Sequence, residues 1–500
     1  MSEPLEIVIV GGGTAGWMCA VALASVAGNK ICKLTLIESA EIASVGVGEA
    51  TLPQMKEFND RIGINEADMM RQTNATIKLG IQFVDWGAIG NSYVHPFGKY
   101  GNPIGGAYFY QQWARADQQN LAKNIDSYSY AIECALQNRF EFPVADKNYI
   151  NSTYSYAYHF DASLYADYLR KIGEQKNVRR VEGKIIHVLN NSTTGVIESV
   201  ELEDGRSIRG DFFIDCSGFR SLLLGQNLNA EFDDWSKWLV CDKAFAVPSE
   251  KTLPLTPYTR STAKKAGWQW RIPLQHRTGN GYVFCSEYIS DDEAAASLLQ
   301  DLDGKALGDP RLIKFKAGRY KKSWYKNCLA IGLSSGFLEP LESTSIYLIQ
   351  VAILNLLKFF PRKTPDELVI NEYNRIVDYE YERVRDFLIL HYHLNQRDDA
   401  ELWRYCREMS VPESLTQKIE IFKRRGFIDS YKYGLFAQPS WISVFTGQGL
   451  KQQGFDPFAL NLSIEDVNNQ LESLFTEIKN RVVDVPTHEA FIADYCAAKL

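Results

Sequence analysis

The sequence lacks paired cysteines. Its nine cysteines stand singly, at positions 19, 32, 134, 216, 241, 285, 328, 406 and 496, and no CxxC pair occurs. An odd and scattered set argues against a disulfide framework and against a zinc site. We therefore predict no metal centre and a reducing compartment, the cytoplasm.

Long blocks of like charge are also missing. The net charge of −7 is spread along 500 residues. The sequence therefore offers no block of basic residues that would bind nucleic acid or an anionic membrane. One uncharged stretch, residues 7–28, is long enough to cross a bilayer. Gly11, Gly12 and Gly13 interrupt it, and it lacks the basic segment of a signal peptide. We expect no export, no membrane anchor and a small-molecule partner.

The first forty residues alternate between strand and helix. Residues 6–10 form an apolar run, 15–27 an alanine-rich helical stretch and 34–37 a second apolar run. This order predicts a βαβ unit of a doubly wound fold, which binds ligands at the carboxyl ends of its strands. Three more strands are predicted at 185–189, 195–202 and 211–214, with Asp204-Gly205 as a hairpin turn between two of them.

The composition suggests three parts of a mixed α/β fold. A discontinuous, Rossmann-like nucleotide-binding module is predicted at residues 1–80, 160–235 and 310–360. Segments rich in Trp, Tyr and Phe, at 81–160 and 236–310, are predicted to form a substrate lobe. Residues 361–500 are predicted to be a mainly helical extension packed on the same body. Its first helix is expected to use Thr364 as cap, Pro365 in the first turn and Glu367 to complete a capping box.

The strongest local motif is the glycine loop GGGTAG at residues 11–16. It follows an apolar strand and opens a helix, which is the context that a GxGxxG motif requires. Gly11 permits a tight turn, Gly13 lets the backbone approach a pyrophosphate, and Gly16 allows close packing of helix and strand. Glu38 ends the second strand, where a carboxylate can accept hydrogen bonds from ribose hydroxyls. These residues predict a dinucleotide site but do not distinguish NAD from FAD.

Two tryptophans stand two residues apart in the segment GWQWRIP. Trp268, Trp270, Ile272 and Pro273 form the pattern WxWxIP. Alone, such a pair is typical of two core side chains on one face of a strand. The pattern also resembles the signature of the flavin-dependent tryptophan halogenases. In that setting, bulky indoles keep an oxidisable substrate out of direct contact with the flavin.

Other stretches resemble the same family. They are GVGEAT at residues 46–51, DFFIDCSG at 211–218, GLSSGFLEPLESTS at 332–345, and residues 386–392 with Trp403-Arg404. The resemblance runs from residue 7 to beyond residue 400. It implies an FAD-binding module of the GR2 type, with FADH2, O2 and either chloride or bromide as reactants. Since no second GxGxxG occurs, a separate NAD(P)H-dependent flavin reductase is expected to supply the FADH2.

The resemblance also assigns roles to individual residues. Lys78 matches the family's catalytic lysine, which binds hypohalous acid by a hydrogen bond or becomes a haloamine, and Glu342 matches its partner carboxylate. Such a carboxylate can polarise the electrophile, stabilise the cationic arenium intermediate or accept the ring proton. Taken alone, either residue would be an ordinary surface charge. Thr344 and Ser345 match the halide site, where backbone N–H groups hold the anion; the family often has Gly in place of Ser345.

The remaining assignments concern flavin and substrate. Flavin contacts are expected from Gly11, Gly13, Thr14, Ala15, Gly16, Glu38, Ala50, Ile185, Leu333 and Ile346. His95 and Phe97 resemble the HxF element that sandwiches an indole, and Trp441 is expected to line the same pocket. The other six histidines, including His391 and His393, show no ligand spacing or aromatic setting.

Several alternatives stay open from the sequence. Some members of the family bind free tryptophan through a tyrosine pair and acidic groups, and residues 440–449 do not align with these groups. Free tryptophan, indole, a substituted indole and a larger aromatic molecule therefore all remain candidate substrates. Assembly as a homodimer is also open. The rival functions are an aromatic hydroxylase, which product mass in the presence of bromide would distinguish, and a flavin-binding protein without turnover.

Overall fold

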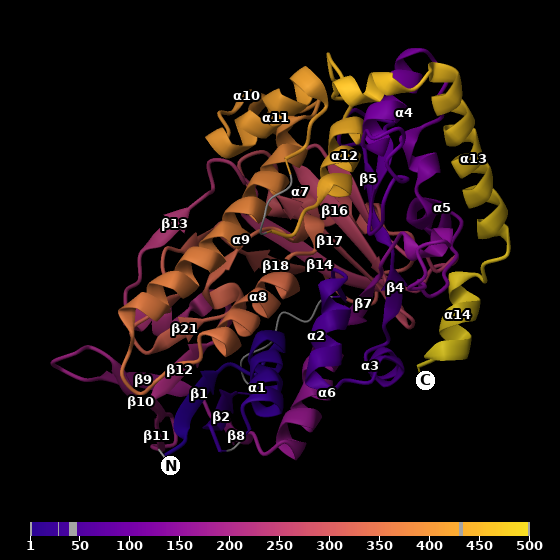
Figure 1. Cartoon of the computed structure of the whole chain (residues 1–500). Coiled ribbons are helices and arrows are strands. Elements are labelled where there is room, and N and C mark those ends of the chain that lie inside the picture. The colour runs from indigo at the N-terminus through magenta and orange to yellow at the C-terminus, as the bar shows by residue number, and fades with distance from the viewer. Residues whose placement is uncertain (1–2, 29, 40–47, 430–433, 499–500) are drawn as a thin grey trace.

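The computed structural model describes residues 3–28, 30–39, 48–429 and 434–498 of the chain (Figure 1). Residues 46 and 47 of the GVGEAT stretch lie outside the described residues. Two large sheets carry the fold, and helices cover them. Most of the described apolar side chains that are buried belong to one continuous core.

The first large sheet has six strands and contains the N-terminal βαβ unit. Its order is β20-β21-β12-β1-β2-β8, and β1 pairs in parallel with both β2 and β12. In chain order the strands are β1 (Leu5–Val10), β2 (Cys32–Glu38), β8 (Arg179–Glu182), β12 (Phe212–Asp215), β20 (Trp324–Tyr325) and β21 (Cys328–Ala330). Helix α1 (Thr14–Val26) crosses from β1 to β2 and packs on α6 (Ala162–Gln175) and α8 (Ser345–Lys358). The predicted mixed α/β fold with a Rossmann-like parallel sheet is confirmed.

The second large sheet has seven strands in the order β18-β14-β17-β16-β15-β5-β6. All its pairs are antiparallel except β15 with β5. The strands are β5 (Gly80–Val84), β6 (Ser92–Pro96), β14 (Lys243–Glu250), β15 (Thr259–Lys264), β16 (Gly267–Pro273), β17 (Arg277–Phe284) and β18 (Arg311–Lys314). The WxWxIP segment is therefore one whole strand, β16, in the interior of this sheet.

Three small sheets complete the strand structure. They consist of β9 (Ile185–Asn190), β10 (Ile197–Leu202) and β11 (Ser207–Arg209); β13 (Phe232–Asp234), β19 (Gly318–Tyr320) and β22 (Gly336–Phe337); and β3 (Gly48–Ala50), β4 (Thr76–Lys78) and β7 (Ala157–Asp161). In the last sheet, β7 pairs with β3 on one side and with β4 on the other. The glutamate-containing segment after residue 47 is thereby brought close to the strand that ends at Lys78.

The remaining helices surround the two sheets, and those after residue 360 form most of the upper and right-hand rim in Figure 1. They are α2 (Gln54–Ile62), α3 (Glu66–Gln72), α4 (Phe109–Gln118), α5 (Tyr130–Leu136), α7 (Asp291–Gln300), α9 (Glu367–His393), α10 (Glu401–Glu408), α11 (Glu413–Arg425), α12 (Gln438–Gly447), α13 (Ile464–Val483) and α14 (His488–Tyr495). Helix α13 packs on α4 and α5, and α12 packs on β6. The C-terminal segment thus closes over the strand that carries His95.

Two local predictions were wrong. Helix α9 is capped by Asp366, whose carboxylate accepts from the N–H groups of Leu368 and Val369. Neither Thr364 as cap nor the capping box with Glu367 is present, because the helix begins two residues later than predicted and Pro365 precedes the cap. The Asp204-Gly205 turn joins β10 to β11, whereas the predicted strand at 211–214 belongs to β12 and pairs with β1. β11 escaped prediction because it is only three residues long and mostly polar.

The cap of α9 gives the first prediction. Asp366→Ala removes the acceptor for two first-turn amides, a change that typically costs about 1 kcal/mol. Hydrogen exchange at residues 368–370 should accelerate about fivefold, which corresponds to that energy. Thr364→Ala, which removes the other candidate cap, should leave these amides unchanged. Equal acceleration in the two variants would contradict the assignment.

Candidate active site

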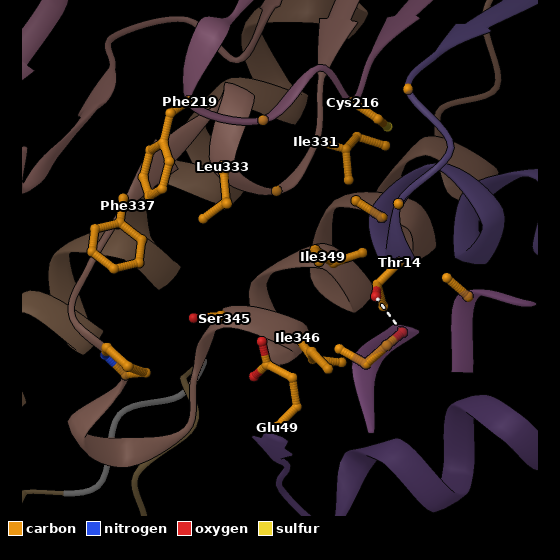
Figure 2. Close-up of a pocket in the computed structure, with 18 of the residues that line it drawn as sticks. Thr14, Glu49, Cys216, Phe219, Ile331, Leu333, Phe337, Ser345, Ile346 and Ile349 are labelled. Atoms are coloured by element: carbon orange, nitrogen blue, oxygen red, sulfur yellow. Dashed lines mark hydrogen bonds between the residues drawn. The ribbon is translucent and has the colours of Figure 1, made fainter. Parts of the chain in front are cut away.

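A cavity of about 670 Å³ lies at the carboxyl ends of the parallel strands. The segments after β1, β2 and β12 all reach it, which is the usual place for a ligand in a doubly wound sheet. Its opposite wall comes from β16 and from the start of α8. Figure 2 shows Thr14, Cys216 and Ile331 on one side of the cavity and Phe219, Leu333 and Phe337 on another, with Glu49 below Ser345 in this view. The predicted flavin contacts on its wall are Gly11, Gly13, Thr14, Ala15, Glu38, Ala50, Ile185, Leu333 and Ile346.

The glycine loop fits the cavity closely. Gly11 has φ +115°, and a Cβ there would overlap the carbonyl group of Cys216. A Cβ on Gly16 would overlap the carbonyl oxygen of Gly11, so this glycine serves packing and does not line the cavity. Gly13, by contrast, has no heavy atom within 4 Å of a Cβ position and borders the open cavity. A ligand phosphate could therefore approach the backbone there without obstruction.

Glu38 stands at the end of β2 beside this loop. Trp17 Nε1 donates to its Oε2 at 3.1 Å, and Arg180 forms an ion pair with its Oε1. These contacts orient the carboxylate along the cavity wall. Gly12 is required next to it, since a Cβ would collide with the Glu38 side chain.

The tryptophan pair forms part of the far wall. Trp268 and Trp270 both line the cavity, with ring centroids 6.1 Å apart. Trp268 Nε1 donates to Oε2 of the buried Glu339 at 2.6 Å. Ile272 also lines the cavity, whereas Pro273 lies behind it, where its carbonyl oxygen accepts from Thr76 Oγ1 at 2.7 Å. This hydrogen bond connects β16 to β4, the strand that carries Lys78.

Lys78 is completely buried behind this wall. Its Nζ donates to the carbonyl oxygen of Thr51 at 3.0 Å and to Ser343 Oγ at 2.8 Å, and it lies 5.0 Å from the ring centroid of Phe97. Ser343 itself lines the cavity. One hydroxyl group therefore links the cavity wall to an amine that water does not reach.

Burial changes the acidity of this amine. Loss of hydration lowers the pKa of Lys78 to about 7, and the negative charge of Glu342 opposes part of that shift. Within the described residues, Lys78 forms no ion pair with Glu342 or with any other carboxylate. A substantial share of Lys78 is therefore a neutral amine near pH 7.

Glu342 is fully buried and is held by two histidines. His95 Nδ1 lies 2.8 Å from its Oε2, and His391 Nε2 lies 2.7 Å from its Oε1. Burial alone would raise the pKa of Glu342, but the two histidines lower it to about 2. The carboxylate is therefore ionised throughout the neutral pH range.

The sequence reasoning missed His391. It lies deep in an aromatic setting, stacked on Phe83 with centroids 4.6 Å apart, and its contact with Glu342 is direct. The prediction that no other histidine has an aromatic setting was therefore wrong. His391 and His393 do point apart on α9, since His393 meets the carbonyl oxygen of Cys406 instead.

The segment after Glu342 turns sharply into helix α8. Ser343 has φ +59°, Thr344 is the N-cap residue and Ser345 begins the helix. Ser345 and Ile346 line the cavity, while the Thr344 side chain is buried behind it and its Oγ1 has no hydrogen-bond partner among the described residues. The first N–H groups of a helix have no intrahelical acceptor. They form a site suited to an anion at the cavity wall.

An aromatic cluster adjoins the lysine on the side away from the cavity. The His95 ring contacts Phe97, Phe387 and Phe436, with centroids 6.5, 5.7 and 6.2 Å away. Trp441 meets Phe387 edge-on at 5.1 Å and has no ring contact with His95 in the described structure. The structure thus groups His95 with Phe97 and puts Trp441 one layer further out.

Comparison with known proteins decides the family. A family model described as tryptophan halogenase matches residues 6–463. The chain belongs to the tryptophan halogenase family. It is 34% identical to tryptophan 7-halogenase KtzQ of Kutzneria sp. (strain 744), with 97% of each protein covered.

Solved structures agree with this assignment. This halogenase superposes on Xcc4156, a flavin-dependent halogenase from Xanthomonas campestris, with a TM-score of 0.96 and 41% identity over 100% of this chain and 99% of that one. For BrvH, a flavin-dependent halogenase from Brevundimonas sp. BAL3, the TM-score is 0.95 and the identity 41%, covering 99% and 100%. The prediction of a flavin-dependent halogenase is confirmed at the level of family and enzyme class.

Two further features bear on the expected partners. Among the described residues of the halogenase, no group of three or more His, Cys, Asp or Glu side chains is arranged to hold a metal ion. No helix in the described part of the chain combines the length and apolarity needed to span a bilayer.

The open space beside Gly13 yields a second prediction. Gly13→Ala should leave the melting temperature of the flavin-free halogenase unchanged, since the added methyl group meets no atom within 4 Å. It should weaken FAD binding about tenfold, or ~1.4 kcal/mol, because the methyl group would occupy space beside the phosphate-binding backbone. Gly308→Ala, at another open glycine outside the cavity, should affect neither quantity. FAD affinity equal to that of the parent protein would contradict the proposed cradle.

Proposed function

We propose that this halogenase uses FADH2, O2 and chloride or bromide to halogenate an indole-like aromatic substrate, and that Lys78 delivers the halogen. The observation that carries the proposal is the burial of the Lys78 amine next to Ser343, which lines the cavity. A free hypohalous acid would attack many sites. An amine fixed between cavity and substrate restricts the attack to one ring position.

The cavity suits FAD in size and chemistry. Its volume of about 670 Å³ lies within the range of cofactor pockets. The backbone around Gly13 and the start of α1 would hold the pyrophosphate, and Glu38 would hold a ribose. Ala50, Ile185, Leu333 and Ile346 would supply apolar contacts along the wall. When bound, reduced FAD with O2 supplies the oxidation of halide to hypohalous acid.

The halide is proposed to bind at the N-terminus of α8. Backbone N–H groups of Thr344 and Ser345 are suited to one monovalent anion. Ser345 in place of glycine does not remove this capacity, since the main chain is the donor. The proposal places the halide at the cavity wall, between the flavin site and the Lys78–Ser343 hydrogen bond.

Lys78 is proposed to act as a neutral amine. Its lone pair attacks the halogen of hypohalous acid, so that an N–halogen bond forms, the O–halogen bond breaks and water leaves with the amine proton. The ring carbon of the substrate then takes the halogen as the N–halogen bond breaks, and the proton lost from that carbon returns to the nitrogen. The lowered pKa of Lys78 supports this route, because an ammonium group has no lone pair.

Glu342 is proposed to stabilise positive charge during this transfer. Its low pKa, caused by His95 and His391, makes it a weak base but a permanent anion. A buried anion stabilises the cationic arenium intermediate more strongly than a solvated one would. His95, Phe97 and, one layer further out, Trp441 are proposed to orient the aromatic ring by stacking and edge contacts.

The wider context of the enzyme is also a proposal. A separate NAD(P)H-dependent flavin reductase supplies FADH2. The three parts defined from the sequence act as flavin module, substrate lobe and helical extension. The protein works in the cytoplasm. The free thiol state of all nine cysteines is consistent with a reducing compartment. Relatives are named as halogenases of tryptophan at the 7- or 6-position, which supports an indole ring as the reacting group.

Removal of the amine tests the proposal. Lys78→Ala, given FADH2, O2 and bromide, should lower the yield of halogenated indole at least 100-fold, the scale expected when a positioned reactant is lost. FAD affinity and the amount of hypohalous acid trapped in solution should stay within about twofold, because Lys78 does not line the cavity. Lys56→Ala, at a partly exposed lysine on α2 outside the cavity, is the control. Retained regioselective product would contradict the proposal, and a hydroxylated product would favour the hydroxylase.

The pH dependence tests the protonation state. In single turnovers, the rate of halogen transfer should rise with pH and reach half its maximum near pH 7, because the buried Lys78 loses its proton there. Hypohalous acid formation is measured in parallel, so that the transfer step is separated from the flavin step. A transfer rate that falls as the pH rises through 7 would instead require the ammonium form.

A further inference from the structure

Two buried carboxylates stand at the two ends of one short turn. Glu339 precedes the 3-10 turn Pro340–Glu342, and Glu342 ends it. Their exposed fractions are 2% and 0%, and neither has a Lys or Arg partner in the described part of the chain. Buried carboxylates are costly unless hydrogen-bonded. The groups that hold them therefore fix the conformation of the turn.

Consecutive residues of α9 reach both carboxylates. His391 Nε2 lies 2.7 Å from Glu342 Oε1, and the Tyr392 hydroxyl donates to Glu339 Oε2 at 2.6 Å. Successive helical residues point about 100° apart, so one helix contacts both ends of the turn from two directions. The same Oε2 of Glu339 accepts from Trp268 Nε1 at 2.6 Å.

The surroundings of His391 hold the ring in place and keep it neutral. Gln448 Nε2 donates to the Tyr93 hydroxyl oxygen at 3.3 Å and to the His391 carbonyl oxygen at 2.9 Å. The Tyr93 hydroxyl oxygen also lies 3.2 Å from His391 Nδ1. Burial lowers the pKa of His391, which keeps the ring neutral. A neutral ring thus lies 2.7 Å from the carboxylate, in a close contact of Nε2 with Oε1 that does not meet hydrogen-bond geometry in the described structure.

The turn connects the two halves of the site. On one side, Glu339 holds Trp268, which lines the flavin cavity. On the other side, Glu342 is followed directly by Ser343, the hydrogen-bond partner of Lys78. A displacement of the turn would move the cavity wall and the lysine partner together.

We propose that His391 and Tyr392 are positioning residues for halogen transfer. His391 holds Glu342, the residue before the Ser343 that accepts from Lys78, in place. Tyr392 holds Glu339 and, through it, Trp268. Neither residue touches the reacting atoms. This inference rests on the proposed role of Lys78. It concerns the groups that hold Ser343, the hydrogen-bond partner of Lys78, and Trp268, on the cavity wall, in fixed positions relative to each other.

The charges around Glu342 define a pH test. The titratable groups that face it are Lys78 from β4, Tyr93 and His95 from β6, and His391 from α9. Burial raises the pKa of Glu342, and the two histidines lower it. Without His391 only His95 opposes the effect of burial, so Glu342 should take up a proton at a higher pH.

The first experiment compares His391→Leu, His391→Gln and the control His393→Leu in the FAD-loaded enzyme with bromide and indole. His391→Leu should lower halogenated product at pH 6 about tenfold while trapped hypohalous acid stays within about twofold, and the loss should shrink as the pH rises. Gln keeps a polar side chain beside Glu342 and should recover most of the product. The control should match the parent. Full activity of His391→Leu at all pH values, or an equal loss of hypohalous acid, would overturn the proposal.

The second experiment addresses Tyr392. Tyr392→Phe removes one of two donors to Glu339, so the hold on Trp268 weakens and FAD affinity, measured by flavin fluorescence, should fall about threefold or more. Tyr373→Phe is the matched control, since this buried tyrosine of α9 donates to the carbonyl oxygen of Ala352 instead. Unchanged affinity in Tyr392→Phe, or an equal change in both variants, would overturn this part.

The role of Lys78 and the positioning role of α9 can fail separately. If Lys78→Ala still yields regioselective product, the role of the lysine is wrong whatever α9 does. If Lys78→Ala is inactive while His391→Leu behaves as the parent at every pH, the lysine role stands and the positioning role of α9 is wrong.

Discussion

The site depends on keeping water away from one lysine side chain. The amine of Lys78 lies behind the cavity wall, where it has two hydrogen-bond acceptors and an aromatic ring but no carboxylate within ion-pair distance in the described structure. In water a lysine would be an inert cation at neutral pH. Here loss of hydration favours the neutral form, which is the form that the proposed halogen transfer requires.

In the proposed function, the rest of the architecture separates the oxidant from the substrate. The Rossmann-like sheet provides the cavity, and the tryptophan strand β16 closes its far side. The aromatic cluster around His95 lies beyond the lysine. Ser343 belongs to both regions, because it lines the cavity and accepts from Lys78. Under the proposed function, the halogen passes this wall and the substrate does not.

Sequence was informative where structure is decided locally. The βαβ unit and the glycine loop were predicted because strand, turn and helix lie within forty residues and each glycine has a steric reason. Lys78 and Glu342 carry no such local signal, and only the resemblance to a family singled them out. His391 was missed because its contact with Glu342 depends on how α9 packs against a distant turn. Thr364 and Asp366 both offer a capping oxygen, and the sequence alone does not choose between them.

The most direct test of the central claim is the ionisation of Lys78 itself. Lysine labelled with carbon-13 at Cε would be introduced into the flavin-free protein, and the NMR signal of residue 78 would be assigned by its absence in Lys78→Arg. Titration should give a pKa of about 7 for this amine. A pKa near the ordinary value of 10.5 would show an ammonium group that water still solvates, and would contradict the account.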